Sequence, residues 1–118
     1  MEDYTLGAIE SRFADIVWKH APLSTGELIR LCEQELGWKR TTTYTVLKKF
    51  SKRGIFDNQN GTVIVRITKE EFYARQSECY VEHSFHGSLP GFVAAFTSRR
   101  KLSAKEIEEL QQIIDQNK

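Results

Sequence analysis

Hydrophobic residues in the first part of the chain recur every three or four positions, the spacing of a helix with one buried face. The first segment with this pattern covers residues 5–19. Ser24 and Glu27 then have the spacing of a capping box, which marks the start of a second helix. This helix is predicted to run to Leu36, because Gly37 is the residue type that most often ends a helix.

A third amphipathic helix is predicted within Trp38–Arg53, with Gly54 as its terminator. Its apolar face consists of Val46, Leu47 and Phe50. Only the short link Gly37–Arg40 separates this helix from the one before it. Two helices joined by so tight a turn indicate a helix-turn-helix arrangement.

After Gly54 the pattern changes from helical spacing to alternation. From Thr62 to Ile67, the apolar Val63, Val65 and Ile67 alternate with Thr62, Ile64 and Arg66, as in a strand with one buried face. Ile55–Asn58 reads as a preceding strand, and the Asn60-Gly61 pair between the two is the strongest short signal for a hairpin. A hairpin directly after a helix-turn-helix predicts the wing of a winged-helix domain.

The second half of the chain returns to helical spacing at residues 69–85, at residues 88–97, and from a capping box formed by Ser103 and Glu106. About 50 residues in amphipathic helices are too few to bury their own apolar surface. We therefore expect a second copy of the chain to cover Phe72, Tyr80, Phe85, Leu89, Phe92, Phe96, Ile107, Leu110 and Ile114. The alternative is that this half folds back on the first half.

These patterns predict an α+β, mostly helical fold. Residues 1–68 are expected to form a winged helix-turn-helix DNA-binding domain, and residues 69–118 a C-terminal helical dimerisation domain. A chain of 118 residues has room for one domain or for a small domain with an appendage.

Charge becomes informative only through its distribution, since the net charge is +1. The segment Trp38–Arg53 holds six of the 17 Lys and Arg residues and no acid. A basic, hydroxyl-rich helix face suits a polyanion, so we predict DNA contacts by Lys39, Arg40, Thr41, Thr42, Tyr44, Thr45, Lys48, Lys49, Lys52, Arg53 and, at the wing tip, Asn60. Trp38 has two interpretations: a hydrophobic staple before the helix, or a side chain that faces DNA.

Other chemistry is sparse in this sequence. Cys32 and Cys79 lie far apart, which favours reduced thiols and a cytoplasmic location. No signal peptide or membrane-spanning run is evident, and no phosphate loop or nucleophile motif predicts an enzyme or a cofactor. Cys79, His83 and His86 fall at i, i+4 and i+7, so a metal site on one helical face is an alternative, although we expect no metal.

Short motifs follow one another in a fixed order along the chain. They are Ile16-Val-Trp-Lys-His20, Trp38, Thr42-x-x-Thr45-Val-Leu47, Lys52-Arg-Gly54, Lys69-Glu-Glu-Phe72, Phe85-His-Gly-Ser-Leu89 and Leu102-Ser-x-x-Glu106-Ile107. No single motif is specific, but by their order and spacing the chain resembles the penicillinase-repressor family, the bacterial regulators of β-lactamase and methicillin-resistance genes.

The resemblance implies a homodimeric winged-helix repressor whose C-terminal helices interlock with those of its partner. Two recognition helices would enter successive major grooves of a roughly palindromic operator in double-stranded DNA. Thr42 and Thr45 stand where the family offers hydroxyls toward DNA, and Lys49 stands where it often has a basic residue. Such a dimer would repress transcription by covering a promoter element. The genes under its control would be antibiotic-resistance or cell-envelope stress genes.

The resemblance leaves the inducing signal open. Some family members are inactivated by cleavage in the C-terminal helices, which makes a regulatory protease a candidate partner, but Ala95-Phe96 stands here where those members have Asn before Phe. Copper-responsive members carry Cys-x-Cys pairs that this sequence lacks. Two other functions stay as alternatives: a metal-responsive repressor, and a winged-helix protein–protein interaction module whose basic face docks on an acidic protein.

Overall fold

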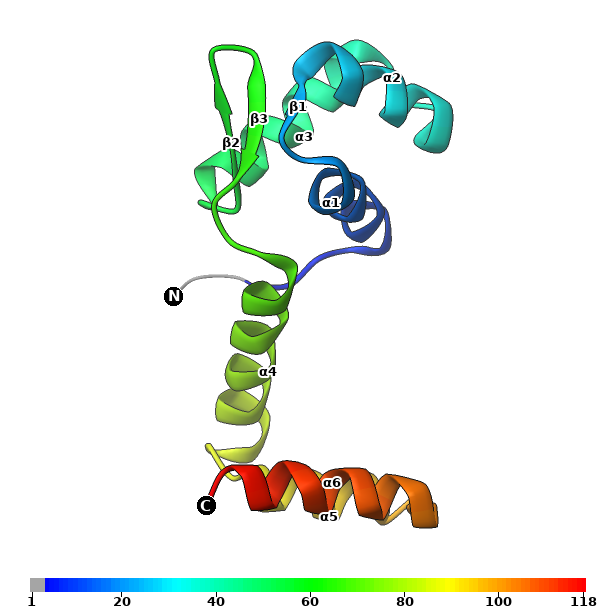
Figure 1. Cartoon of the computed structure of the whole chain (residues 1–118), viewed down its shortest axis with the longest axis vertical. Coiled ribbons are helices and arrows are strands. Elements are labelled where there is room, and N and C mark those ends of the chain that lie inside the picture. The colour runs from blue at the N-terminus through cyan, green and yellow to red at the C-terminus, as the bar shows by residue number, and fades with distance from the viewer. Residues whose placement is uncertain (1–3) are drawn as a thin grey trace. The chain divides into compact units, whose positions relative to one another are not determined.

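The computed structural model describes residues 4–118, which form helices and a small antiparallel sheet (Figure 1). The predicted α+β, mostly helical fold class is confirmed. The chain divides into two compact units, the first ending at Ser77 and the second comprising Glu78–Lys118. This division lies within a long helix, α4 (Lys69–Phe85), whereas the sequence patterns placed a boundary just before it.

The helices of the first unit are α1 (Ala8–His20), α2 (Thr25–Leu36) and α3 (Arg40–Lys52), so the three helices predicted here are confirmed. α1 begins later than expected because the Glu10 carboxylate accepts a hydrogen bond from the Gly7 N–H at 3.1 Å. That bond satisfies a backbone donor at the helix start and so favours initiation after Gly7.

Capping interactions define both ends of α2. Ser24 Oγ accepts from the Glu27 N–H at 3.0 Å, as predicted. The Glu27 carboxylate, expected to complete the capping box, instead accepts from Arg30 Nε at 3.2 Å. At the other end Gly37 takes a φ of 67° and donates to the Glu33 carbonyl at 3.0 Å, which reverses the chain toward α3.

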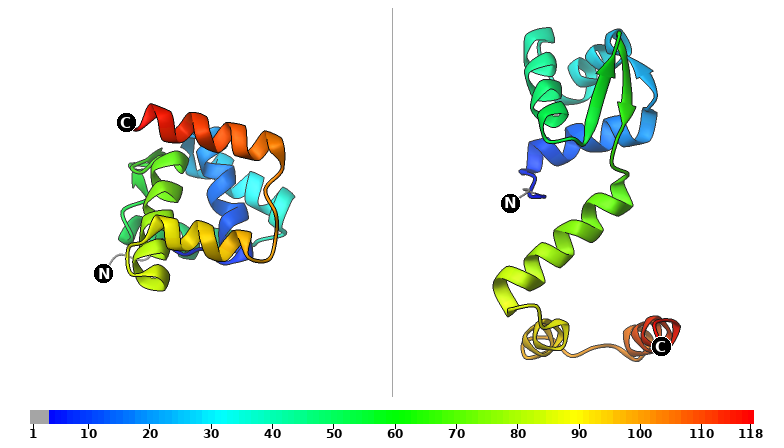
Figure 2. Two further views of the ribbon diagram at one scale, coloured as in Figure 1. Left: turned by 90° about the horizontal axis from the view of Figure 1, so that it is seen from below. Right: turned by 90° about the vertical axis from the view of Figure 1, so that its left-hand side faces the viewer.

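The sheet has the order β1-β3-β2, formed by β1 (Leu23–Ser24), β3 (Thr62–Val65) and β2 (Phe56–Gln59). Gln59 pairs with Thr62, so Asn60 and Gly61 form the two-residue turn of the predicted hairpin (Figure 2). Their φ values of 53° and 89° are those that Asn-Gly turns supply. The hairpin is confirmed, with β2 starting and ending one residue later than predicted and β3 ending at Val65, two residues before the predicted Ile67. The strand β1 was not predicted.

Aromatic rings fill the core of the first unit. Phe50 stacks on Phe56 with 5.3 Å between ring centroids, and Phe13 lies 5.1 Å from Phe50. Phe72 belongs to the same core, with 0% of its surface exposed and its ring 5.7 Å from that of Trp18. This residue was expected at a dimer interface, but its own chain already buries it fully.

The first two turns of α4 are part of the first unit because several contacts hold them there. Trp18 Nε1 donates to the Ile67 carbonyl at 3.0 Å, just before the helix begins. Lys69 Nζ pairs with the Asp15 carboxylate of α1 at 3.0 Å. With Phe72 in the core, these contacts place the helix start against α1 and explain why the chain divides after Ser77.

The second unit contains the rest of α4, together with α5 (Leu89–Thr97) and α6 (Ala104–Gln116), so the helices predicted in this half are confirmed. α4 ends where His86 and Gly87 take positive φ values of 51° and 81°. The predicted capping box of α6 forms in both directions, at 3.1 Å from the Glu106 N–H to Ser103 Oγ and 3.0 Å in return.

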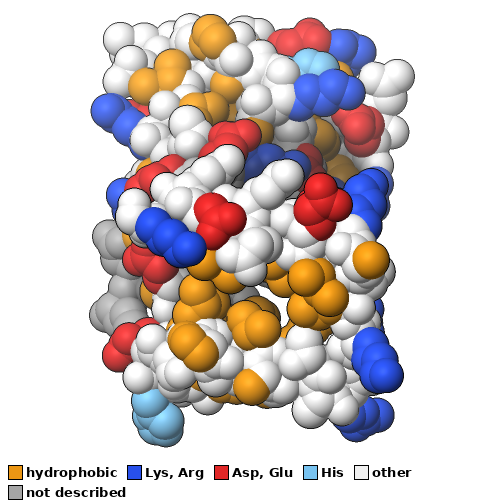
Figure 3. All heavy atoms as spheres, turned by 60° about the horizontal axis from the view of Figure 1, so that its bottom comes forward, with side chains coloured by type: hydrophobic (Ala, Val, Ile, Leu, Met, Phe, Trp, Pro, Cys, Tyr) orange, Lys and Arg blue, Asp and Glu red, His pale blue; other side chains and the backbone are white. Residues whose placement is uncertain are grey.

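The second unit leaves most of its apolar side chains uncovered. Neither α5 nor α6 contains a buried residue. Figure 3 shows hydrophobic side chains gathered on the face of this unit. Large side chains with more than a third of their surface exposed here are Tyr80, Leu89, Val93, Phe96, Ile107, Leu110, Ile113 and Ile114. Phe85 and Phe92 are half-buried, with their rings 5.5 Å apart.

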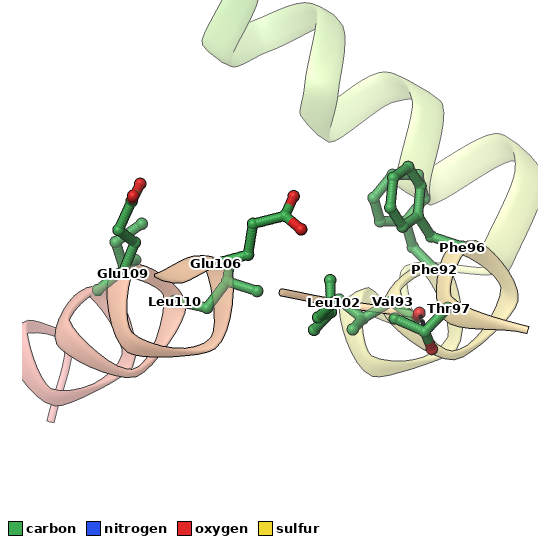
Figure 4. Close-up of a pocket in the computed structure, with 9 residues that line it drawn as sticks. Phe92, Val93, Phe96, Thr97, Leu102, Glu106, Glu109 and Leu110 are labelled. Atoms are coloured by element: carbon green, nitrogen blue, oxygen red, sulfur yellow. Dashed lines mark hydrogen bonds between the residues drawn. The ribbon is translucent and has the colours of Figure 1, made fainter. Parts of the chain in front are cut away.

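An open apolar hollow of about 340 Å³ lies between α5 and α6. Figure 4 shows Phe92, Phe96 and Val93 on one side of it and Leu110 on the other. The acids Glu106 and Glu109 stand at its rim. Such a hollow is the shape that a packed apolar side chain would fill, and the described chain places none in it.

Candidate nucleic-acid interface

Helix α3 has one buried and one exposed face. Thr43, Leu47 and Phe50 are buried against the core. The residues of α3 that were predicted to contact DNA are all exposed: Arg40, Thr41, Thr42, Tyr44, Thr45, Lys48, Lys49 and Lys52. Lys39 precedes the helix as its N-cap and is exposed as well. The helix therefore presents hydroxyls and cations together on the side that the core does not use.

In the described part of the chain, the cations of this face lack ion-pair partners. Within residues 4–118, none of the ion pairs involves Lys39, Arg40, Lys48, Lys49 or Lys52. The other Lys and Arg residues of the first unit include Arg30, Arg66 and Lys69, which do form ion pairs with acids. A group of unneutralised cations along one helix is suited to the phosphates of a nucleic acid.

The hydroxyls of α3 differ in how they are used. The Thr43 hydroxyl is buried and donates to the Lys39 carbonyl at 3.5 Å. Thr45 is exposed, and its Oγ1 donates to the Thr41 carbonyl at 2.9 Å, which leaves the lone pairs of that oxygen able to accept a hydrogen bond. Thr42, next to Thr43 in the helix, is exposed. An exposed hydroxyl or methyl on such a helix is suited to base edges.

Tyr44 is held in place at the start of this face. The Arg40 guanidinium lies 5.7 Å from the centre of its ring. The Tyr44 pKa is lowered from its ordinary value, first by a hydrogen bond from the Thr25 side chain and then by Arg40. Thr25, the first residue of α2, was missed by sequence reasoning because nothing in the local pattern shows that the fold brings it to Tyr44.

Arg53 belongs to the predicted set, but the structure uses its guanidinium within the chain. Nη2 donates to the Thr5 carbonyl at 3.0 Å, and the guanidinium lies 5.7 Å from the centre of the Phe50 ring. The side chain is half-buried at the end of α3. Lys52, its neighbour, points to solvent instead.

Trp38 packs inward. Its ring stacks on that of Phe13 in α1, with 5.6 Å between centroids and 21° between planes. Of the two interpretations, the structure supports a hydrophobic anchor that fixes the turn before α3. The anchor packs against α1, whereas a staple would pack against an apolar fourth residue of its own helix, and that position is Thr43.

The wing tip is polar and tied to the start of α2. Asn58 Oδ1 accepts from the Gly61 N–H at 2.9 Å, which rigidifies the turn. The Gly61 carbonyl accepts from the Thr25 N–H at 2.9 Å. Asn60, predicted to contact DNA, is exposed at this tip. At the base of the wing Arg66 pairs with Asp57 at 2.7 Å, which lowers the pKa of that carboxyl.

The residues considered for a metal do not form a cluster. Cys79 is half-buried on α4, and His86 lies beyond the end of that helix with a φ of 51°, so the expected helical spacing is broken. Among residues 4–118 no group of three or more His, Cys, Asp or Glu side chains is placed to hold a metal ion. In the same residues no helix is both long and apolar enough to cross a membrane.

Comparison with known proteins agrees with this architecture. Residues 6–116 match the family model described as the penicillinase repressor. A penicillinase repressor of Bacillus licheniformis is 28% identical over 107 residues, which cover 87% of this chain and 84% of that protein. The methicillin resistance regulatory protein MecI of Staphylococcus aureus is 22% identical over 116 residues, 95% of this chain and 94% of its own. The chain therefore belongs to the penicillinase-repressor family.

Proposed function

We propose that this protein is a transcriptional repressor that binds a palindromic operator in double-stranded DNA as a homodimer. The observation that carries the proposal is the outer face of α3, where cations without acidic partners stand beside exposed hydroxyls on the second helix of a helix-turn-helix. Membership in a repressor family supports the same conclusion. The protein would act in the bacterial cytoplasm, where its operator lies, and without catalysis or a cofactor.

The two kinds of side chain would divide the work of recognition. Lys39, Arg40, Lys48, Lys49 and Lys52 supply phosphate contacts, which position the helix and provide most of the affinity. Thr41, Thr42, Tyr44 and Thr45 are the candidates for base edges in the major groove. Asn60 and the backbone of the wing tip would add a contact beside the groove.

The second unit supplies the dimer in this proposal. A face on which Leu89, Ile107, Ile113 and Ile114 each expose more than half of their surface is unusual for a chain that works alone. A second copy is the occupant proposed, because a two-fold interface places the same apolar residues opposite one another. Each copy would then fill the hollow between α5 and α6 of its partner. The dimer would then place two α3 helices, one from each copy, on the same operator.

Repression would follow from occlusion, since a dimer seated on a promoter element blocks polymerase. A regulatory protease is the candidate for its release. The place at which related repressors are cut corresponds to Ala95-Phe96, both exposed residues of α5. Ala95 stands where those repressors have Asn, so release by another signal is the second candidate.

The decisive experiment is a DNA-binding titration of a promoter fragment by mobility shift at two salt concentrations. Affinity should fall steeply as salt rises, because bound cations displace counterions from the phosphates. Arg40→Ala combined with Lys49→Ala should abolish retention, while Lys105→Ala, which removes a cation from exposed α6, should not. Retention that survives the double substitution would instead favour the protein–protein interaction module.

A further inference from the structure

Tyr4, Thr5 and Leu6, which precede α1, connect two elements that are distant in sequence; we call this segment the strap. The Thr5 carbonyl accepts from Arg53 Nη2 at 3.0 Å, at the end of α3. The Tyr4 carbonyl accepts from Gln76 Nε2 at 2.7 Å, on the second turn of α4. Two consecutive carbonyls of the strap therefore bind two different helices.

The Tyr4 side chain adds a second attachment to α4. Its hydroxyl oxygen accepts from Arg75 Nη1 at 2.9 Å. Its ring meets that of Phe72 edge-on, with 5.6 Å between centroids, and the Arg75 guanidinium lies 5.7 Å from its centre. Leu6 is half-buried and packs against the core of the first unit, as Tyr4 does. Polar and apolar contacts thus hold the strap against α4 and the core of the first unit.

Arg75 is itself fixed for this role. Its Nε donates to the Glu71 carboxylate one turn earlier at 2.8 Å. The pKa of Arg75 is raised above its ordinary value, first by the hydrogen bond to Tyr4 and then by Glu71. A guanidinium shared between a carboxylate and a phenol is held in one orientation, because its planar donors cannot satisfy both from another rotamer.

The same two turns are also anchored by Trp18, which contacts Phe72 as Tyr4 does, and by the Asp15–Lys69 pair already described. These contacts hold α4 as far as Gln76, and the compact unit ends one residue later. The strap in addition reaches the end of α3, through the Thr5 carbonyl.

We propose that the strap is a positioning element that couples the C-terminal end of α3 to the first turns of α4, and that operator recognition depends on it. This inference rests on the proposed function, in which α3 reads DNA and the unit beyond Ser77 joins two copies. If α4 carries the link between copies, its angle to α3 determines where each reading helix stands on a palindromic site. Tyr4 and Arg75 are then positioning residues, not DNA contacts.

The test uses the full chain and a duplex that the wild-type protein selects from a random-sequence pool. Tyr4→Ala should bind this duplex about tenfold more weakly, an effect of the size usual for coupling between two parts of a protein. In a second duplex, two base pairs are inserted between the half-sites. The ratio of affinities for the selected duplex and this second duplex should be smaller for Tyr4→Ala than for the wild type. Lys105→Ala, an exposed cation of α6, is the control and should match the wild type in both respects.

Tyr4→Phe tests the role of the hydroxyl and guards against simple loss of the fold. It keeps the ring against Phe72 and the carbonyl bound to Gln76, so its spacing discrimination should lie between those of Tyr4→Ala and the wild type. Unchanged discrimination in Tyr4→Ala would overturn the inference. So would an equal loss of affinity for both duplexes, because that result indicates fewer folded molecules instead of a loosened angle.

Hydrogen exchange separates the inference from the proposed function. In Tyr4→Ala, the amides of residues 70–77 and of the end of α3 should exchange faster, while those of α6 should not change. A wild-type protein that enriches no duplex would overturn the repressor proposal, and exchange would still decide the coupling. Unchanged exchange of the amides of residues 70–77 and of the end of α3 would overturn the coupling even if DNA binding is confirmed.

Discussion

At the scale of single residues, Lys52 and Arg53 show how two adjacent cations acquire different roles. Both follow the same basic pattern in the sequence, and both were predicted to contact DNA. Lys52 is exposed, whereas Arg53 is half-buried with its guanidinium on the Thr5 carbonyl. The partner that distinguishes them lies 48 residues away along the chain. Local composition cannot identify such a contact.

The proposed division between phosphate and base contacts predicts different outcomes for two substitutions in α3. Lys49→Ala should weaken binding to all sequences and lower the slope of log affinity against log salt by about 1, as for the loss of one phosphate contact. Thr42→Ala should leave that slope unchanged and relax the preference at one base position. Anisotropy titrations over a salt series on operator and scrambled duplexes measure both. Identical slopes for Lys49→Ala and the wild type would contradict the assignment.

Tyr44 offers a finer residue-scale prediction. The Thr25 side chain is the first cause of the lowered pKa of Tyr44, and the Arg40 guanidinium lies 5.7 Å from the centre of the Tyr44 ring. Thr25→Val removes the Thr25 hydroxyl at nearly constant volume, so it should reduce operator affinity, because the Tyr44 hydroxyl then loses a neighbouring donor. Tyr44→Phe should have a similar effect, and the two together should not add, because they remove one interaction. Full additivity in the double variant would show that Thr25 acts independently.

At the scale of elements, α4 combines residues that serve two purposes. Phe72 packs in the core of the first unit, while Tyr80 on the same helix exposes 54% of its surface. Both were predicted to lie at a dimer interface because a helical stripe shows which residues are apolar but not which surface covers them. The residues after Ser77 belong to the other compact unit, so the role changes along the helix.

This change of role predicts contrasting variants. Phe72→Ala should lower the unfolding free energy of the first unit by about 3–5 kcal/mol, the cost of emptying a buried aromatic site, and leave dimer dissociation unaffected. Phe96→Ala should weaken the dimer with little effect on that unfolding. Both tryptophans, Trp18 and Trp38, lie in the first unit, so their fluorescence in a urea titration reports its unfolding selectively. Phe72→Ala that dissociates the dimer without lowering stability would contradict this account.

Sequence patterns predicted the elements well where a local signal exists. Helical spacing located the helices, and the Asn60-Gly61 pair located the turn of the wing because only a few residue types adopt its positive φ values. β1 was missed because two residues, Leu23 and Ser24, are too short to show a period. The exposed face of α3 was predictable from charge and spacing, but the contribution of Thr25 depends on a contact that only the fold creates.

At the scale of the whole molecule, each compact unit lacks something that the proposed function requires. The first unit has one reading helix, and a palindromic operator needs two. The second unit exposes apolar residues on α5 and α6, and a second copy would cover them. Ile114→Glu should therefore produce a monomer with a folded first unit, because a carboxylate cannot be buried at a two-fold interface without a partner. Sedimentation would detect it, and a variant that remains dimeric would exclude Ile114 from the interface.

The position of the division within α4 determines how a separate reading head should be made. A chain that ends at Ile67 loses Phe72 from the core and Lys69 from its pair with Asp15, so it should unfold at low urea. A chain that ends at Ser77 keeps both, together with Gln76 on the strap, and should unfold cooperatively as a monomer. It should bind a single half-site weakly, since it lacks the second reading head that multiplies affinity on a palindrome. Urea titrations and anisotropy of both fragments test this, and equal stability of the two would show that the first turns of α4 contribute nothing to the first unit.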